Sequence, residues 1–192
     1  MNDFVVWRSC YEEGLCVIGN PHGLEDQFPL LDGVPLLTGW PEKVTCKMSP
    51  KYPKDIQLAD NLYGCSYPIV SGRIKEQIAA ADGGGQIEFL PVTILNHKGR
   101  VASTGYYFLN PVGSVDCIDI DKSRVKWNAI DNTAISSFEQ LVLKEDAIPP
   151  GVAVFRPKHR TQTILASRSL ADRLEADGFT GLYFVEPSQF QG

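Results

Sequence analysis

Apolar residues are most concentrated between residues 86 and 121, in three runs separated by turn-forming residues. The first two runs, 87–95 and 104–110, flank the turn-forming sequence Asn-His-Lys-Gly at 96–99, and a third run covers 115–120. Two β-rich runs joined by a few residues that include glycine are typical of an antiparallel hairpin. Because these runs are apolar over most of their length, we expect strands that are covered on both faces. The pattern predicts that this segment is the core of the sheet.

Two segments have the spacing of apolar residues that is typical of amphipathic helices. The first begins after Ser71, a favourable N-cap residue, and ends at glycines 83–85, which are expected to adopt the left-handed conformation. The second covers residues 168–177, with Ser167 as its N-cap and Gly178 directly after its end. We therefore expect two main helices.

Further apolar runs predict short strands before and after these segments. They cover residues 4–7, 15–19, 138–143, 152–155, 161–165 and 182–185. The order is strands, a helix, several strands, a helix and a strand, without a regular βαβ repeat. This order predicts an α+β fold with a largely antiparallel sheet, in a single domain that covers residues 1–192.

The N-terminal part contains a long segment, residues 20–67, that is rich in proline and glycine. Proline fixes φ and removes a backbone donor, so long regular elements are not expected there. The segment is nevertheless too apolar for a disordered linker, as the sequence between Phe28 and Trp40 illustrates. We expect an ordered excursion of turns and short strands over the core sheet. The domain would then consist of a Pro-rich strand and loop part, 1–68, and a core of sheet and helices, 69–186.

Composition narrows the functional classes. The formal net charge is −5, so the overall field does not favour nucleic acid or an anionic membrane as a partner. No segment has the roughly 20 apolar residues of a membrane helix, and the first 13 residues lack the features of a secretory signal. The five cysteines are scattered and form no CxxC pair. These features predict a cytoplasmic protein with reduced, mostly structural thiols.

Motifs for catalysis, cofactors and metals are absent from the sequence. Glycines 83–85 follow a helix instead of opening one, which excludes a phosphate-binding loop. Asp116, Asp119 and Asp121 lack the glycine and glutamate of a calcium loop; in a strand, the last two would share a face. Their role stays open between turn capping and binding of a cation or a basic partner. The short basic segment 156–160 is interpreted as a solvated loop. We predict no catalytic residue, no cofactor site and no metal site.

The three histidines lie in turns and in the basic segment, far from one another in the sequence. His22 and His97 lie in turn-forming sequences, and His159 lies in the basic segment. A cysteine and a histidine that meet only in three dimensions would still allow nucleophilic chemistry. No GxSxG, HExxH or SxxK motif supports this reading.

Aromatic residues of the excursion are the most informative candidates for binding. Trp40, Tyr52 and Tyr63 lie close in sequence to Asp55 and Asp60. Tyrosine and tryptophan with a polar rim are typical of protein–protein hot spots, although the same rings could also cover the core sheet. We take these five residues as the predicted partner-binding residues.

Several segments of the chain, in the same order, resemble a known family, the bacterial immunity proteins of polymorphic toxin systems, specifically the eleventh immunity class known from myxobacteria and other proteobacteria. The resemblance is carried by residues 87–92, 106–111, 115–119 with Ser123, 154–156, 163–165, Ser167 with its helix, and 180–184. It covers about residues 69–186. The N-terminal third resembles the family only in having short strands and a Pro-rich passage.

The resemblance implies a cytoplasmic, non-enzymatic protein that binds a cognate toxin, encoded in the adjacent gene, and neutralises it in competition between bacteria. Two alternatives from other classes remain. One is a small hydrolase or transferase with a Cys, His and Asp site assembled from distant segments, which a pocket holding His97 or His159 beside a Cys or Asp would favour. The other is a regulatory ligand-binding domain that self-associates through an edge strand. The sequence does not define the toxin or the oligomeric state.

Overall fold

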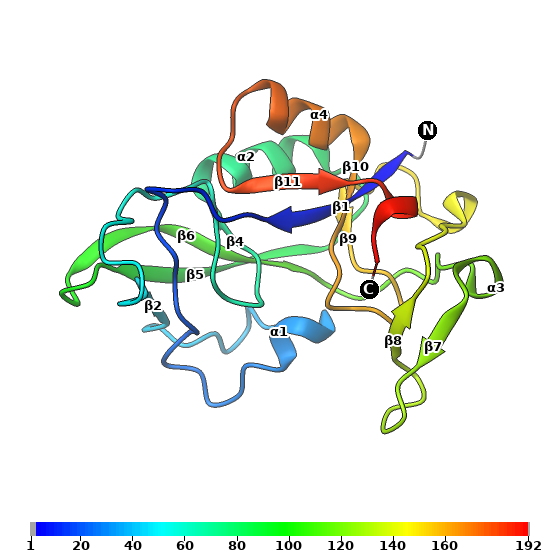
Figure 1. The fold of residues 1–192 in the computed structure, drawn as a ribbon, viewed down its shortest axis with the longest axis horizontal. Helices are drawn as coiled ribbons and strands as arrows, with labels where there is room; N and C mark the ends of the chain where they lie inside the picture. The colour runs from blue at the N-terminus through cyan, green and yellow to red at the C-terminus, as the bar shows by residue number, and fades with distance from the viewer. Residues whose placement is uncertain (1–2, 192) are drawn as a thin grey trace.

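The computed structural model describes residues 3–191 and is built around a long hairpin, as Figure 1 shows. Strand β5 (Ile87–Leu95) pairs with β6 (Val101–Pro111) in antiparallel register, with Leu90 opposite Phe108. The turn between them is closed at Asn96, whose side chain accepts hydrogen bonds from the amides of Lys98 and Arg100. The hairpin predicted from the apolar runs is confirmed.

The hairpin belongs to a five-stranded sheet with the order β2-β5-β6-β4-β3. Its other strands are β2 (Thr45–Lys47), β3 (Asn61–Leu62) and β4 (Ile69–Ser71). All neighbours are antiparallel except β2 and β5, which run parallel with Cys46 opposite Ile94.

A second sheet of four antiparallel strands has the order β11-β1-β10-β9. It consists of β1 (Phe4–Ser9), β9 (Val154–Phe155), β10 (Leu165–Ser167) and β11 (Leu182–Val185). The first strand of the chain therefore lies between two strands from its C-terminal part. The expected single sheet is divided in two, and the small hairpin of β7 (Val125–Trp127) and β8 (Ile135–Phe138) adds a third. The α+β class with mostly antiparallel strands is confirmed.

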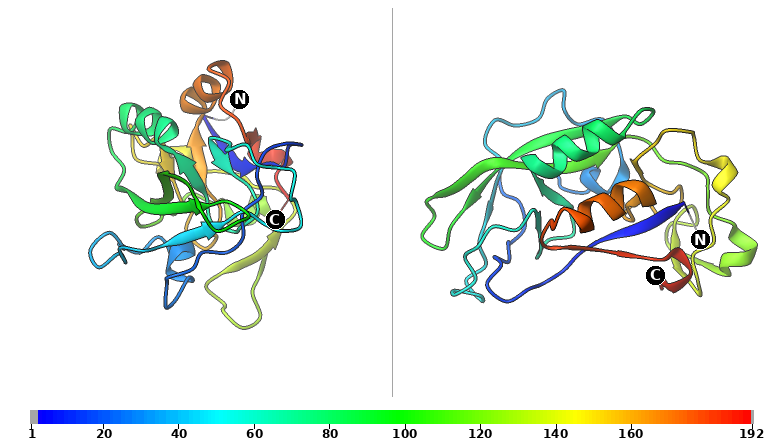
Figure 2. Two further views of the ribbon diagram at one scale, coloured as in Figure 1. Left: turned by 90° about the vertical axis from the view of Figure 1, so that its left-hand side faces the viewer. Right: turned by 90° about the horizontal axis from the view of Figure 1, so that it is seen from above.

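Helices α2 (Gly72–Ala81) and α4 (Arg168–Ala176) lie side by side along one side of the molecule (Figure 1, Figure 2). Each begins as predicted, because the hydroxyl oxygens of Ser71 and Ser167 accept hydrogen bonds from backbone amides three residues later. Both helices bury their apolar faces in one cluster with Trp7 and residues of the two sheets.

The end of α2 differs from the predicted mechanism. Glycines 83–85 do not adopt positive φ, and Asp82 ends the helix in an extended conformation with φ −87° and ψ 115°. The carboxylate of Asp82 accepts hydrogen bonds from the amides of Gly85 and Ala153, at 2.9 and 2.7 Å. These long-range and local contacts, and not left-handed glycine, determine where the chain leaves the helix.

One face of the hairpin's central part is buried, and the other is covered only in part. Leu90, Val92 and Phe108 contribute to the apolar cluster beneath the excursion, whereas Leu109 faces the cluster formed by the helices. The expectation of strands covered on both faces therefore holds only in part, because Pro91 on the second face is exposed and Phe89 and Tyr107 are half-buried. The part of β6 nearest the turn is exposed, with Val101 63% accessible.

Four predicted strands are wrong or displaced. The run at 138–143 overlaps β8 only at Phe138, and beyond it only Leu143 forms an isolated bridge. Residues 115–120 contain isolated bridges at Val115 and Ile118, after which the short helix α3 (Ile120–Ser123) begins. Residues 15–19 also form only isolated bridges. The strand expected at 161–165 overlaps β10 only at Leu165, because the amide of Thr163 closes a turn onto the carbonyl of Arg160.

Asp119 is the N-cap of α3, and its carboxylate accepts a hydrogen bond from the amide of Lys122. Asp121 lies in the first turn of this helix. The two carboxylates therefore do not share one face of a strand. For Asp119, the capping alternative is the one that the structure contains.

The excursion is ordered and packs over one face of the five-stranded sheet. It contains the short helix α1 (Pro29–Asp32), strands β2 and β3, and isolated bridges such as Val17 with Tyr63. Its apolar residues, among them Leu30, Val44 and Met48, are buried with the hairpin. Two 3-10 turns, Glu145–Ala147 and Pro187–Gln189, complete the described structure.

Candidate partner-binding surface

Three tyrosines form an exposed aromatic cluster, which we call the tyrosine cluster (Tyr11, Tyr52 and Tyr63). The ring centroids of Tyr11 and Tyr52 are 5.5 Å apart, and those of Tyr11 and Tyr63 are 6.3 Å apart. The three residues are 45%, 38% and 39% exposed, respectively. Rings at these separations contact one another, yet each still offers a substantial surface to a partner.

Asp55 supports this cluster from below. It is buried, and one carboxylate oxygen accepts a hydrogen bond from the Tyr11 hydroxyl at 3.0 Å. The other oxygen accepts from the amide of Gly14 at 3.1 Å. The hydrogen bond to Asp55 raises the pKa of Tyr11, because it stabilises the protonated phenol. Asp55 therefore orients an aromatic side chain instead of presenting its charge at the surface.

The chain segments that carry the cluster are joined by backbone hydrogen bonds. The amide of Cys16 donates to the carbonyl of Gln57, and the amide of Ile18 donates to the carbonyl of Tyr63. These contacts place the turn that contains Tyr11 beside the two segments that carry Tyr52 and Tyr63. A rigid aromatic surface results from segments that are distant in sequence.

The cluster has a polar rim of both signs. Glu12 and Glu13 are exposed directly after Tyr11, and Lys51 and Lys54 are exposed on either side of Tyr52. Ile56, which is 62% exposed, adds an apolar residue to the same chain segment. Aromatic anchors with a charged periphery are typical of protein–protein interfaces.

Asp60, in contrast, is a buried residue that accepts hydrogen bonds from several segments. It is 8% exposed and accepts hydrogen bonds from the hydroxyl of Ser71 at 2.9 Å and the guanidinium of Arg73 at 3.2 Å. The amide and hydroxyl of Thr180 also donate to it. Asp60 therefore connects the excursion, the start of α2 and the segment before β11.

Trp40 lies away from the tyrosines, against the hairpin. Its indole nitrogen donates to the carbonyl of Pro91 at 2.9 Å, and its ring meets the edge of Phe108 with 5.8 Å between centroids. Of the five predicted residues, Tyr52, Tyr63 and Asp55 are brought together. Asp60 and Trp40 have other surroundings, and Tyr11 is the member of the cluster that the sequence did not indicate.

The remaining candidates are engaged in structural contacts. His97 and His159 make hydrogen bonds with the carbonyls of Ser49 and Thr133, at 3.1 and 2.7 Å. Burial raises the pKa of Cys16 to about 11, which disfavours the thiolate. Within residues 3–191, no group of three or more His, Cys, Asp or Glu side chains is arranged to hold a metal ion.

The basic segment 156–160 is only in part the solvated loop that the sequence predicts. Arg156 is 1% exposed and donates to the carbonyls of Leu30 and Pro111 at 2.9 and 3.1 Å. Lys158, in contrast, is exposed and forms an ion pair with Asp116 at 3.2 Å. The pKa of the Asp116 carboxyl is lowered, mainly because the ammonium group of Lys158 donates a hydrogen bond to it.

No helix in the described part of the chain is both long and apolar enough to cross a membrane. A search among curated proteins found no match. A scan against protein families matched residues 14–188 to the immunity protein family Imm11. This match covers nearly the whole chain, including the tyrosine cluster residues Tyr52 and Tyr63. The chain belongs to the Imm11 immunity protein family.

Proposed function

We propose that this protein is a non-enzymatic antidote that binds one cognate bacterial toxin and neutralises it in the cytoplasm of the producing cell. Membership of an immunity protein family supports toxin neutralisation as the general role. The observation that supports this binding site is the tyrosine cluster, in which the partly exposed ring of Tyr11 packs against the partly exposed rings of Tyr52 and Tyr63. We expect the toxin to be encoded in the adjacent gene.

The proposed mechanism is occlusion. Tyrosine supplies a large contact area with few rotatable bonds, so little conformational entropy is lost when a partner covers it. Tyr11 is already fixed by its hydrogen bond to Asp55, which further lowers the cost of binding. The charged residues at the rim, Glu12, Glu13, Lys51 and Lys54, would orient the toxin during encounter, and the tyrosines would set the dissociation rate.

The experiment measures affinity for the purified product of the adjacent gene. Alanine at both Tyr52 and Tyr63 is expected to weaken binding by about 30-fold or more, since even one hot-spot truncation costs about 2 kcal/mol or more. Phe28→Ala is the control, because Phe28 is an aromatic residue that is 74% exposed but neither contacts the rings of the cluster nor lines a pocket. Asp55 and Asp60 are unsuitable for this test, because their replacement would disturb internal hydrogen bonds.

A survival assay tests the function itself. Cells that express the toxin should survive with the wild-type protein and with Phe28→Ala, and should lose protection with the double variant. Undiminished affinity of the double variant would refute the binding site. Absence of any complex with the wild-type chain, or protection that requires catalytic turnover of a toxin product, would refute the proposed function.

A further inference from the structure

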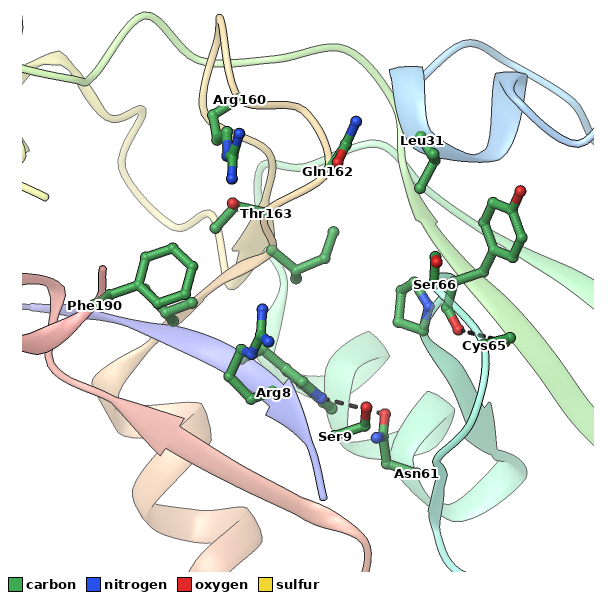
Figure 3. Close-up of a pocket in the computed structure, with 15 residues that line it drawn as sticks. Arg8, Ser9, Leu31, Asn61, Cys65, Ser66, Arg160, Gln162, Thr163 and Phe190 are labelled. Atoms are coloured by element: carbon green, nitrogen blue, oxygen red, sulfur yellow. Dashed lines mark hydrogen bonds between the residues drawn. The ribbon is translucent and has the colours of Figure 1, made fainter. Parts of the chain in front are cut away.

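A pocket of about 290 Å³ opens where the two sheets meet. Its walls come from β1, from the segment 65–68 before β4, and from the segment 160–164 before β10 (Figure 3). Phe190 closes one side, and Asn61 closes the opposite end, where its side chain accepts a hydrogen bond from the indole of Trp7. The pocket is separate from the tyrosine cluster, none of whose members lines it.

The charge of the lining is positive and uncompensated. Arg8 and Arg160 both line the pocket, and no Asp or Glu is among the described residues that line it. Neither arginine forms an ion pair with a carboxylate of residues 3–191. In Figure 3 the two side chains extend toward one another from opposite walls. Two guanidinium groups that face each other repel, and an anion between them would relieve this repulsion.

Arg160 is fixed in place but incompletely hydrogen bonded. Its Nη1 donates to the carbonyls of Ile135 and Ser136, at 2.8 and 3.1 Å. Its Nε is buried and has no hydrogen-bond partner among the described residues. A buried donor without a partner is costly and rare in folded proteins. Burial lowers the pKa of Arg160, and the charge of Arg8 lowers it further.

Arg8 has the opposite character, because it is exposed and free to adjust. It extends from β1, and its guanidinium carbon lies 5.6 Å from the centre of the Phe190 ring. Thr163 lies between the two arginines in Figure 3, with its hydroxyl directed toward Arg160. The wall therefore combines a fixed cation, an adjustable cation and a neutral hydroxyl donor.

We propose that this pocket binds an oxyanion, a carboxylate or a phosphate group, between Arg8 and Arg160. Guanidinium groups match both kinds of oxyanion, because their planar N–H donors bind two oxygens at once. A volume of about 290 Å³ lies at the small end of ligand sites, which suits one anionic group on a short stem. The group belongs either to a free small molecule or to an acidic side chain of the toxin. The second source rests on the proposed function.

The first arm of the experiment uses the purified full chain and three probes, namely inorganic phosphate, succinate and AMP, at constant ionic strength. Binding is followed by titration calorimetry and by the NMR signal of the Arg160 Nε–H group. A free ligand is expected to shift this signal saturably, and Arg8→Gln is expected to weaken binding about tenfold or more. Arg100→Gln is the control, because it removes the same charge from an exposed position on the hairpin turn.

The second arm measures the affinity of the same variants for the toxin. Loss of affinity in Arg8→Gln but not in Arg100→Gln, without binding of the small probes, assigns the anion to the toxin. Arg8→Gln is preferred to Arg160→Gln, since Arg160 also holds the carbonyls of Ile135 and Ser136 and its loss could affect folding. If neither the probes nor the toxin distinguishes Arg8→Gln from the control, the anion site does not exist. If the wild-type chain binds no toxin, the proposed function fails and the first arm alone decides.

Discussion

The carboxylate of Asp60 lies 2.9 Å from the hydroxyl of Ser71, at the junction between the excursion and helix α2. The same carboxylate accepts hydrogen bonds from Arg73 and Thr180, so three separate segments depend on one buried acid. Replacing it with alanine leaves several donors without a partner. We expect Asp60→Ala to lower the free energy of unfolding by about 3 kcal/mol, measured by urea titration.

Asp60→Asn serves as the matched variant. Asparagine retains an oxygen acceptor but loses the charge that Arg73 contacts, so its effect should be smaller than that of alanine. An Asp60→Ala protein as stable as the wild type would show that the network contributes little to stability.

Gly181 and Gly178 provide a comparison within one turn. Both have positive φ, 76° and 68°, so alanine is strained at either position. A Cβ at Gly181 would lie within van der Waals overlap of the backbone oxygen of Asn61, whereas nothing lies within 4 Å of a Cβ at Gly178. We expect Gly178→Ala to cost about 1 kcal/mol and Gly181→Ala to cost several times more or to prevent folding. Thermal unfolding measures both. Equal losses would contradict the steric argument.

Arg156 is a buried cation whose hydrogen-bond acceptors are mainly backbone carbonyls. Burial lowers its pKa to about 10, and the side chain is still charged at neutral pH. It connects α1 to β6 through the carbonyls of Leu30 and Pro111. We expect Arg156→Met to destabilise the protein by about 3 kcal/mol, because these carbonyls lose their donor inside the core.

The exposed Arg100 provides the control for charge. Arg100→Met should change the free energy of unfolding by less than about 0.5 kcal/mol. The Arg156 prediction fails if the two variants unfold at the same denaturant concentration.

Buried thiols predict a decline of stability in alkali. Burial raises the pKa of Cys16 from 9.0 to about 11 and that of Cys117 to about 12. In the unfolded chain both thiols ionise near 9.0, whereas in the folded chain they stay protonated. Above about pH 9 the folded state binds more protons than the unfolded state, so the free energy of unfolding falls as pH rises to about 11.

Urea unfolding over this pH range provides the measurement. The double variant Cys16→Ala, Cys117→Ala should show a shallower decline than the wild type. Identical slopes would mean that these two thiols do not control the alkaline limit.

Features encoded within a few residues could be predicted from the sequence. Ser71 and Ser167 cap helices through hydrogen bonds that span three residues, and the signal for each is local. The same holds for the hairpin turn at Asn96. The parallel pairing of Cys46 with Ile94 and the division into two sheets depend on contacts between distant segments, which the apolar pattern does not specify.

The candidate surface was predictable only in part, for the same reason. The sequence indicates Tyr52 and Tyr63 by composition, but their neighbour Tyr11 reaches them through backbone pairing with residue 57 and residue 63. In the sequence, Asp60 looks like any surface carboxylate. That it is buried depends on Arg73 and Thr180, which donate hydrogen bonds to it from distant positions. The partner-binding role of Tyr52 and Tyr63 stays a prediction.

Strand β1 lies between β10 and β11, and its residues Val5, Val6 and Trp7 are buried. Its two neighbours come from a much later part of the chain, so during synthesis β1 stays unpaired until β10 and β11 have left the ribosome. Premature termination before residue 182 would leave β1 with one free edge and its apolar side chains open to chaperones and proteases. The stability of the four-stranded sheet would then depend on translation beyond β11 in each molecule.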